Sequence, residues 1–150
     1  MSFITEQHIG LFTKKHYFCN MIEWKDTMMG ALGIVITNES KGSVEATMPV
    51  NNNTCQRYGI LHGGASLALA ETVAGFGSEK LCDENEIPCG LNVSANHIAA
   101  VQIGQTVTAT GKLLFKGKST HIWNVDITDE SGKLISTVRI VNHIIRKDKE

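Results

Sequence analysis

The sequence predicts an α+β fold in which an antiparallel sheet wraps around one long apolar helix. Residues 63–81 carry Ala, Leu and Val on all faces of a helix, which is typical of a helix buried on every side. A strand-turn-strand pattern precedes this segment at 32–50, and strand-like runs follow it. A sheet that encloses most of the helix circumference satisfies both observations, so we expect a single domain over residues 1–150.

The remaining elements have separate signals. Apolar residues recur at helical spacing from about residue 6 to residue 29, which predicts one or two amphipathic helices in an N-terminal extension, residues 1–29. Apolar and polar residues alternate from Val44 to Met48, and a turn near Lys41 completes a hairpin. The later strands are expected at 90–99, 106–115, 120–128 and 134–145. This order of elements is that of the hotdog architecture.

Charge and cysteine content limit the partners. Fourteen Lys and Arg against fifteen Asp and Glu give a net charge of -1, which argues against nucleic acid or an anionic membrane surface as the main partner. The N-terminal run has neither a signal-peptide core nor a membrane span. Four cysteines without a C-x-x-C pair are too sparse for a disulfide scaffold. We therefore expect a cytoplasmic protein with reduced thiols.

Glu71 lies in the middle of the predicted central helix. Its neighbours three and four residues away cannot pair its charge: Leu67, Ala68, Ala74 and Gly75. An unpaired carboxylate in a buried place costs several kcal/mol, so such a residue has a partner or a use. Two interpretations follow, a helix that exposes this one stripe to solvent or a catalytic carboxylate.

The start of the same helix reads His62-Gly63-Gly64. No Ser, Thr, Asp or Asn stands there to cap the first amides, so we expect their N–H groups to be available. Glycines let a ligand oxygen approach the backbone, and the helix dipole favours negative charge at this end. An oxyanion hole for acyl transfer has these properties, although Gly-Gly at a helix start is also a common packing device.

The two groups cannot act on the same carbonyl from one helix. Eight residues separate Gly63 from Glu71, an axial rise of about 12 Å, of which a side chain recovers only a few ångströms. If both are catalytic, a second copy of the helix supplies one of them. A two-fold dimer with antiparallel central helices creates two such sites.

The residues that carry these features also resemble a known family. The run QRYGILHGGASLALAETVAG, residues 56–75, followed by GLNVSANHIAA, residues 90–100, resembles the hotdog-fold acyl-CoA thioesterases of the PaaI-like group. The nearest branch contains 1,4-dihydroxy-2-naphthoyl-CoA hydrolases and aryl-CoA thioesterases. The resemblance extends from about Gly30 to Ile145, and the spacing of Gln56, His62-Gly63 and Glu71 is its specific part.

The resemblance implies a role for each of these residues. Glu71 would be the general base or the nucleophile, and the Gly63 amide would polarise the thioester carbonyl. Gln56 would orient water or substrate, and His62 would position the same carbonyl. In the family, Glu comes from one protomer and the Gln/Gly pair from its neighbour, in agreement with the distance argument. Related enzymes often carry Ser or Thr four residues after the Glu, where this chain has Gly75.

Further residues are candidates for substrate binding. Gly64 would stand beside the substrate, and His97 is either a core histidine or part of the thioester tunnel. Lys118 and Ser119, in the run FKGKST, would donate to the phosphates of coenzyme A; a solvated turn is the alternative, and for any single lysine the simpler one. A cysteine nucleophile, Cys55 with His62 and Glu71 as partners, is the weaker alternative for the chemistry, because Cys55 lies in a polar loop.

The sequence thus predicts a homo-oligomeric thioesterase that hydrolyses an acyl-CoA with an aromatic or otherwise bulky acyl group. We expect a homodimer with shared sites, assembled as a dimer of dimers. We expect no metal or prosthetic group, and coenzyme A is counted as part of the substrate and not as a cofactor. Two other functions stay open on the same fold. One is a dehydratase acting on hydroxyacyl thioesters, and the other is a non-catalytic acyl-CoA-binding subunit.

Overall fold

The computed structural model describes residues 22–146 and confirms the predicted fold class. The N-terminal helices expected over 6–29 lie largely outside the described residues. Their described end holds a 3-10 turn, η1 (Trp24–Asp26), and one short helix, α1 (Met28–Ala31). No helix within 22–146 is long and apolar enough to cross a membrane.

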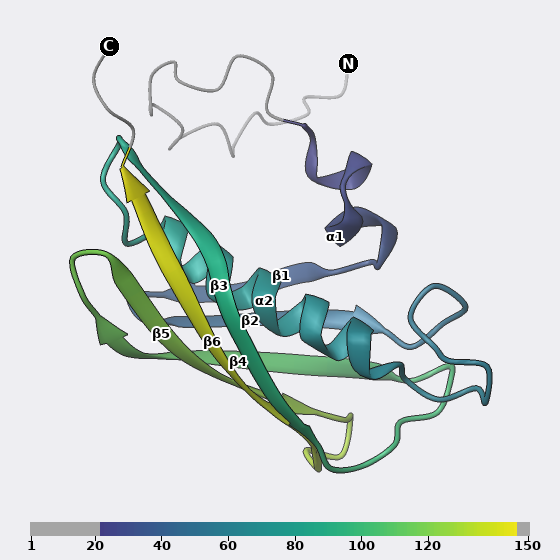
Figure 1. The fold of residues 1–150 in the computed structure, drawn as a ribbon. Helices are drawn as coiled ribbons and strands as arrows, with labels where there is room; N and C mark the ends of the chain where they lie inside the picture. The colour runs from purple at the N-terminus through teal and green to yellow at the C-terminus, as the bar shows by residue number, and fades with distance from the viewer. Residues whose placement is uncertain (1–21, 147–150) are drawn as a thin grey trace, which may run out of the picture.

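The sheet has six antiparallel strands in the order β1-β2-β4-β5-β6-β3 (Figure 1). The central helix α2 (Gly63–Glu79) lies across one face of this sheet. The strands have these bounds: β1 (Val35–Ser40), β2 (Ser43–Pro49), β3 (Glu86–His97), β4 (Thr106–Lys116), β5 (Thr120–Thr128) and β6 (Leu134–Arg146).

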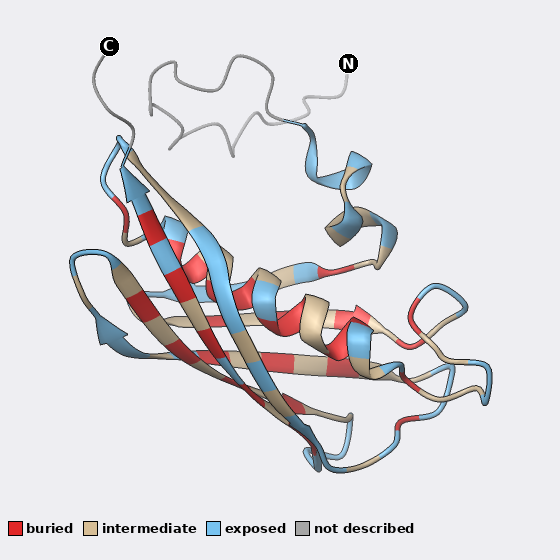
Figure 2. Ribbon diagram, in the orientation of Figure 1, coloured by how far each residue is buried: buried red, intermediate tan, exposed pale blue. Residues whose placement is uncertain are grey.

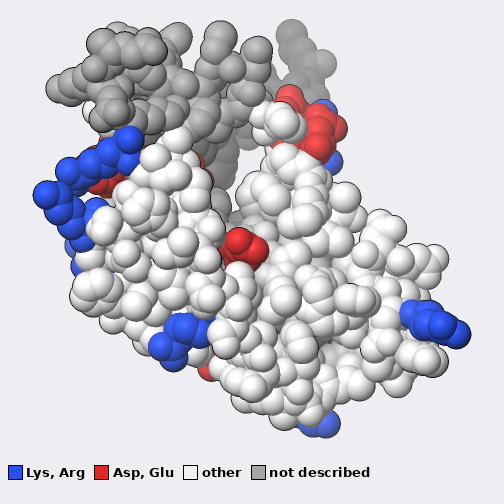
Figure 3. Space-filling view, in the orientation of Figure 1, with Lys and Arg blue, Asp and Glu red and all other residues white. Residues whose placement is uncertain are grey.

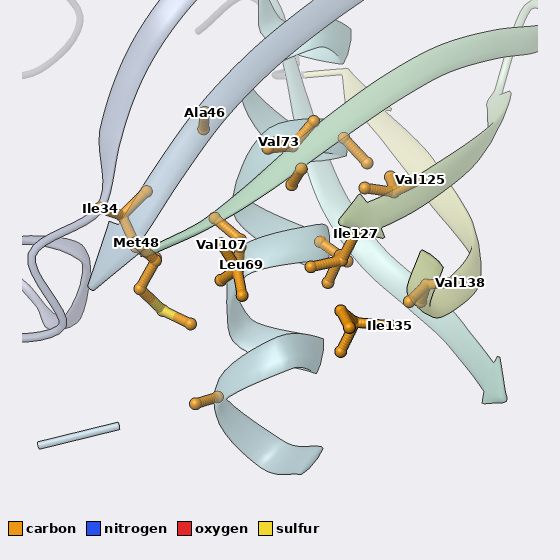
Figure 4. Packing of buried hydrophobic residues seen from close by; sticks show 14 of the residues in the cluster. Ile34, Ala46, Met48, Leu69, Val73, Val107, Val125, Ile127, Ile135 and Val138 are labelled. Carbon is orange, nitrogen blue, oxygen red and sulfur yellow. The ribbon is translucent and has the colours of Figure 1, made fainter. Parts of the chain in front are cut away.

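The core lies between the inner face of the sheet and α2. Buried and half-buried residues alternate along β2 and β5, so each strand turns every second side chain toward the helix (Figure 2). Figure 4 shows these side chains meeting the apolar helix residues Leu69 and Val73, both fully buried. The predicted antiparallel sheet packed against one long apolar helix is therefore confirmed. The expectation of a helix buried on every side was wrong, because the residues of α2 on the side away from the sheet are half-buried or exposed, Glu71 among them.

The C-terminal half of α2 is fixed to the sheet by a buried polar cluster. The Trp123 Nε1–H donates to Ser78 Oγ at 2.9 Å, and Asn142 Nδ2 donates to the same oxygen at 2.9 Å and to the Ala74 carbonyl at 3.1 Å. Gly77 lies so close to the Trp123 ring that an added Cβ would come within 2.4 Å of it. These contacts set the height and rotation of α2 over the sheet, and hence the position of the residues earlier on the helix.

Strand β3 forms one edge of the sheet and differs from the prediction. It begins at Glu86 instead of 90, and it continues through Pro88. A proline is tolerated there because an edge strand is paired on one side only, here with β6. Much of β3 is exposed, which leaves a long edge without a strand partner among residues 22–146.

Candidate active site

His62 caps the central helix. Its backbone is extended, and its Nδ1 accepts a hydrogen bond from the Gly64 N–H at 2.8 Å. The expectation of free amides was therefore wrong for Gly64. The His62 imidazole caps the helix in place of the usual Ser, Thr, Asp or Asn. Since Nδ1 accepts, the neutral His62 ring carries its proton on Nε2. The Gly63 N–H has no hydrogen-bond partner among the described residues.

The ring of His97 lies directly against Gly63. His97 is the last residue of β3, and its Nδ1 is 2.9 Å from the hydroxyl of buried Ser136 on β6. A Cβ added at Gly63 would lie 2.8 Å from His97 Nε2. A glycine is thus needed here for a close approach, as the sequence predicted, but the neighbour within this chain is an imidazole.

These residues line one cavity of about 340 Å³ at the N-terminal end of α2. Gln56 reaches it through a tight turn, in which Gln56 N donates to the Ile60 carbonyl at 2.8 Å and Gly59 adopts a positive φ of 74°. The lining comprises polar and apolar residues: Gln56, Ile60, Leu61, Gly63, Ser66, His97, Ile98, Ala99, Ala100, Ile135 and Ser136. The sequence analysis had named Gln56, Gly63 and His97 but none of the apolar lining residues, and it missed two polar ones, Ser66 and Ser136.

The two missed serines differ in how they could have been found. Ser66 lies three residues after Gly63 and so on a neighbouring position of the helix surface, a spacing that the sequence contains. Ser136 lies opposite His97 in the register between β3 and β6, and a register cannot be read before the strands are paired.

Glu71 is exposed and does not line this cavity. Its carboxylate lies on the backbone of β3 at Gly90, where an added Cβ would overlap Oε1. Among residues 22–146, no cation forms an ion pair with Glu71. The structure therefore combines Gln56, Gly63 and His97 but separates Glu71 from them, as the axial rise along one helix predicted.

The other predicted substrate-binding residues are spread more widely. Lys118 and Ser119 are exposed in the turn between β4 and β5, and the Ser119 carbonyl accepts from Ile144 N at 2.9 Å. Gly64 is exposed, with its amide already bonded to His62. None of the three lines the cavity described above.

Two other chemistries have little geometric support. Cys55 forms an isolated bridge with Leu61 beside the cavity and is not among the lining residues. Its proposed partner His62 already uses Nδ1 for the helix cap. Within residues 22–146, no three His, Cys, Asp or Glu side chains converge as metal ligands.

Comparison with known proteins identifies the family of this chain. Residues 58–136 match the model of the Thioesterase superfamily. The chain is 40% identical to a 1,4-dihydroxy-2-naphthoyl-CoA hydrolase of Listeria monocytogenes, with 79% of this chain and 95% of that protein covered. It is 39% identical to the proofreading thioesterase EntH of Cronobacter sakazakii, with 79% and 86% covered.

A solved structure shares both the fold and the sequence. A thioesterase from Haemophilus influenzae superimposes with a TM-score of 0.78 and is 35% identical, with 82% of this chain and 85% of that chain covered. The chain therefore belongs to the thioesterase superfamily, and its activity is the hydrolysis of a thioester.

Proposed function

We propose that the substrate is an acyl-CoA whose acyl group is aromatic or otherwise bulky, and that hydrolysis needs no metal or prosthetic group. The relative from Listeria monocytogenes, a hydrolase of an aromatic acyl-CoA, supports the substrate class. The cavity supports it as well. Its volume of about 340 Å³ lies in the range of ligand sites, and apolar residues such as Ile60, Leu61 and Ile98 surround a few polar groups.

The proposed chemistry begins at the thioester carbonyl. Glu71 either takes a proton from a water whose oxygen attacks the carbonyl carbon, or attacks that carbon itself and forms an anhydride that water then cleaves. The carbonyl oxygen becomes negative and is stabilised by the Gly63 N–H at the start of α2. Collapse of the intermediate breaks the C–S bond and expels coenzyme A as the thiolate. The thiolate takes the proton that Glu71 removed from water in the first route, or a proton from water in the second route. Gln56 holds water or substrate in line.

The observation that carries this proposal is the separation of Glu71 from the cavity. Glu71 lies at Gly90, and the cavity lies at the His97 end of the same strand, about 23 Å further along an extended chain. One protomer therefore holds two half-sites. A homodimer that joins each half-site to the complementary half-site of its partner completes both.

Strand β3 offers a surface for this dimer. When two copies of β3 pair antiparallel about a two-fold axis, the His97 end of one lies beside the end of the other that contains Gly90. Figure 3 supports an interface on this face, because the charged side chains lie mainly around its rim, with one isolated acidic group near its middle. Pairing also covers a long strand edge that would otherwise invite aggregation.

Mixed dimers test the shared site. Protomers with Glu71→Gln are combined with protomers carrying Gln56→Ala by co-expression with different tags. A mixed dimer has one site with both defects and one intact site, so random pairing restores activity to about a quarter of wild type. Activity equal to the mean of the two parent variants, with mixed dimers confirmed by the tags, would mean that each site lies within one chain.

We further infer a cytoplasmic location and a dimer of dimers. Cys55 and Cys89 form no disulfide among the described residues, which is typical of a reducing compartment. The tetramer follows from the resemblance to PaaI-like enzymes. Light scattering coupled to size exclusion measures its mass, and a dimer mass at micromolar concentration would contradict it.

A further inference from the structure

We propose that Ser136 is a positioning residue for the proposed thioesterase reaction: its hydroxyl donates to His97 Nδ1 and so directs the Nε2–H of His97 toward the thioester oxygen. In this arrangement the oxyanion hole has two donors, the Gly63 amide and the imidazole N–H. The proposal rests on the proposed function and adds to it both a second donor and the residue that orients it.

The sheet itself brings Ser136 and His97 together. The two residues are directly opposite in the antiparallel register of β3 and β6, and both side chains point to the inner face, as do those of the preceding inward pair, Ala95 and Val138. The resulting distance between His97 Nδ1 and Ser136 Oγ is 2.9 Å, that of a hydrogen bond. Only 1% of Ser136 is exposed, so water does not compete for its hydroxyl.

Burial decides which partner donates. If His97 Nδ1 donated, the Ser136 hydroxyl proton would have no acceptor among the described residues, and a buried unsatisfied donor costs about 1–3 kcal/mol. If Ser136 donates, its proton is bonded and only a lone pair is left over. A neutral imidazole has one donor and one acceptor nitrogen, so acceptance at Nδ1 leaves the proton on Nε2.

The position of Nε2 gives this proton a use. Nε2 is 2.8 Å from the place of a Cβ on Gly63, and both residues line the cavity. Gly64 cannot supply the second donor, because its amide is bonded to His62. The first turn of α2 thus offers one amide from Gly63, and a second N–H lies beside it on His97. Two converging donors in a preorganised site are what a developing oxyanion requires.

The tautomer of His97 tests the assignment in the wild-type protein without any substrate. Nitrogen-15 NMR distinguishes an Nε2–H from an Nδ1–H imidazole, and the signal that disappears in His97→Asn identifies the ring. We expect the Nε2–H form in wild type, its retention in Ser136→Thr, and a mixture of tautomers in Ser136→Ala. An Nδ1–H form in the wild-type protein would overturn the proposal.

Kinetics separate positioning from a purely structural role. We expect Ser136→Ala to lower kcat about 10- to 100-fold with KM changed less than about threefold, because the donor acts mainly on the transition state. Ser136→Thr restores most of kcat, and Ser136→Ala adds nothing to the loss in His97→Ala. Thr137→Val is the matched control on β6, since it removes a 2.6 Å hydrogen bond to Asp126 on the outer face and leaves kcat and the His97 tautomer unchanged.

The possible outcomes are distinct from those for the proposed function. Additive losses in the double variant, or an unchanged kcat in a folded Ser136→Ala protein, would overturn the role of Ser136 while leaving thioester hydrolysis intact. A wild-type protein that releases no thiol from any acyl-CoA would instead contradict the proposed substrate class, and the NMR measurement on the same sample would still decide whether Ser136 orients His97.

Discussion

The two ends of α2 are built for different purposes. At the C-terminal end, Ser78 accepts hydrogen bonds from Trp123 and Asn142, and all three residues are almost completely buried. At the N-terminal end, the Gly63 amide has no hydrogen-bond partner among residues 22–146, and Gly63 borders a cavity. The first end stabilises the helix on the sheet, whereas the second leaves polar groups available to a substrate. Substitutions along one helix should therefore separate stability from activity.

Glu71, between the two ends, should show the largest effect on activity. Glu71→Gln keeps the size of the side chain and removes the basic group, so we expect kcat to fall about 10³-fold or more without a change in fold or oligomer. Glu79→Gln, at the exposed end of the same helix, is the matched control and should have the wild-type kcat. Thiol release from an aromatic acyl-CoA measures both. A correctly assembled Glu71→Gln enzyme with near-normal turnover would remove this carboxylate from the mechanism.

Two glycines of α2 test the comparison most directly, because each lies against an aromatic ring. In Gly63→Ala, the new methyl group displaces the His97 ring, which lies at the surface and can move. We expect about 100-fold lower kcat, the effect of misplacing a catalytic group by about 1 Å, with little change in stability. In Gly77→Ala, the methyl group meets the fully buried Trp123 ring, which cannot move.

For Gly77→Ala we therefore expect a loss of stability and a normal kcat. Overpacking a core costs about 1–3 kcal/mol, and the better helix propensity of alanine offsets at most about 1 kcal/mol of that. Urea unfolding and kcat, both measured on each variant, give the comparison. A Gly63→Ala protein that loses stability but retains full kcat would show that the N-terminal end is structural as well.

The fold and half of the site could be predicted from the sequence for physical reasons. The apolar residues of 63–81 and the alternation of apolar and polar residues in 44–48 indicate which side chains are buried, and this pattern can be read from the sequence alone. The separation of Gly63 and Glu71 follows from helix geometry alone. The His97–Ser136 pair and the contact of Glu71 with Gly90 depend instead on strand register and side-chain direction, which no local pattern contains.

His62 should show a smaller effect, and one that separates two roles. His62→Ala removes the cap of α2, which costs about 1 kcal/mol of stability, whereas His62→Asn supplies another cap and restores it. If the exposed Nε2–H also positions the carbonyl, both variants lose about tenfold or more in kcat. Thermal unfolding and thiol release measure the two quantities. Full activity in His62→Asn would limit the role of His62 to the cap.

His121 should show the smallest effect, a pH dependence of the free energy of unfolding. It is paired with Asn142, which bonds to Ser78 at the C-terminal end of α2. His121 is 2% exposed, and its Nδ1 has no hydrogen-bond partner among the described residues. Burial, and next the charge of Lys116, hold the pKa of His121 below its usual value of 6.5, while Glu86 opposes this shift. As the pH falls through about 6.5, the unfolded chain therefore binds a proton that the native His121 does not yet bind.

The sign follows from that difference in bound protons. Since the unfolded state takes up more protons, the free energy of unfolding decreases as the pH falls below about 6.5, by at most about 1.4 kcal/mol per pH unit for one group. Urea unfolding at pH 7.5 and pH 5.5 measures the decrease in wild type and in His121→Gln, which lacks this group. His143→Gln, an exposed histidine on neighbouring β6, is the control and should keep the wild-type decrease. An equal decrease in wild type and His121→Gln would show that the C-terminal end of α2 tolerates a charged imidazole. The difference between the buried C-terminal end and the N-terminal end at the cavity would then depend on packing alone.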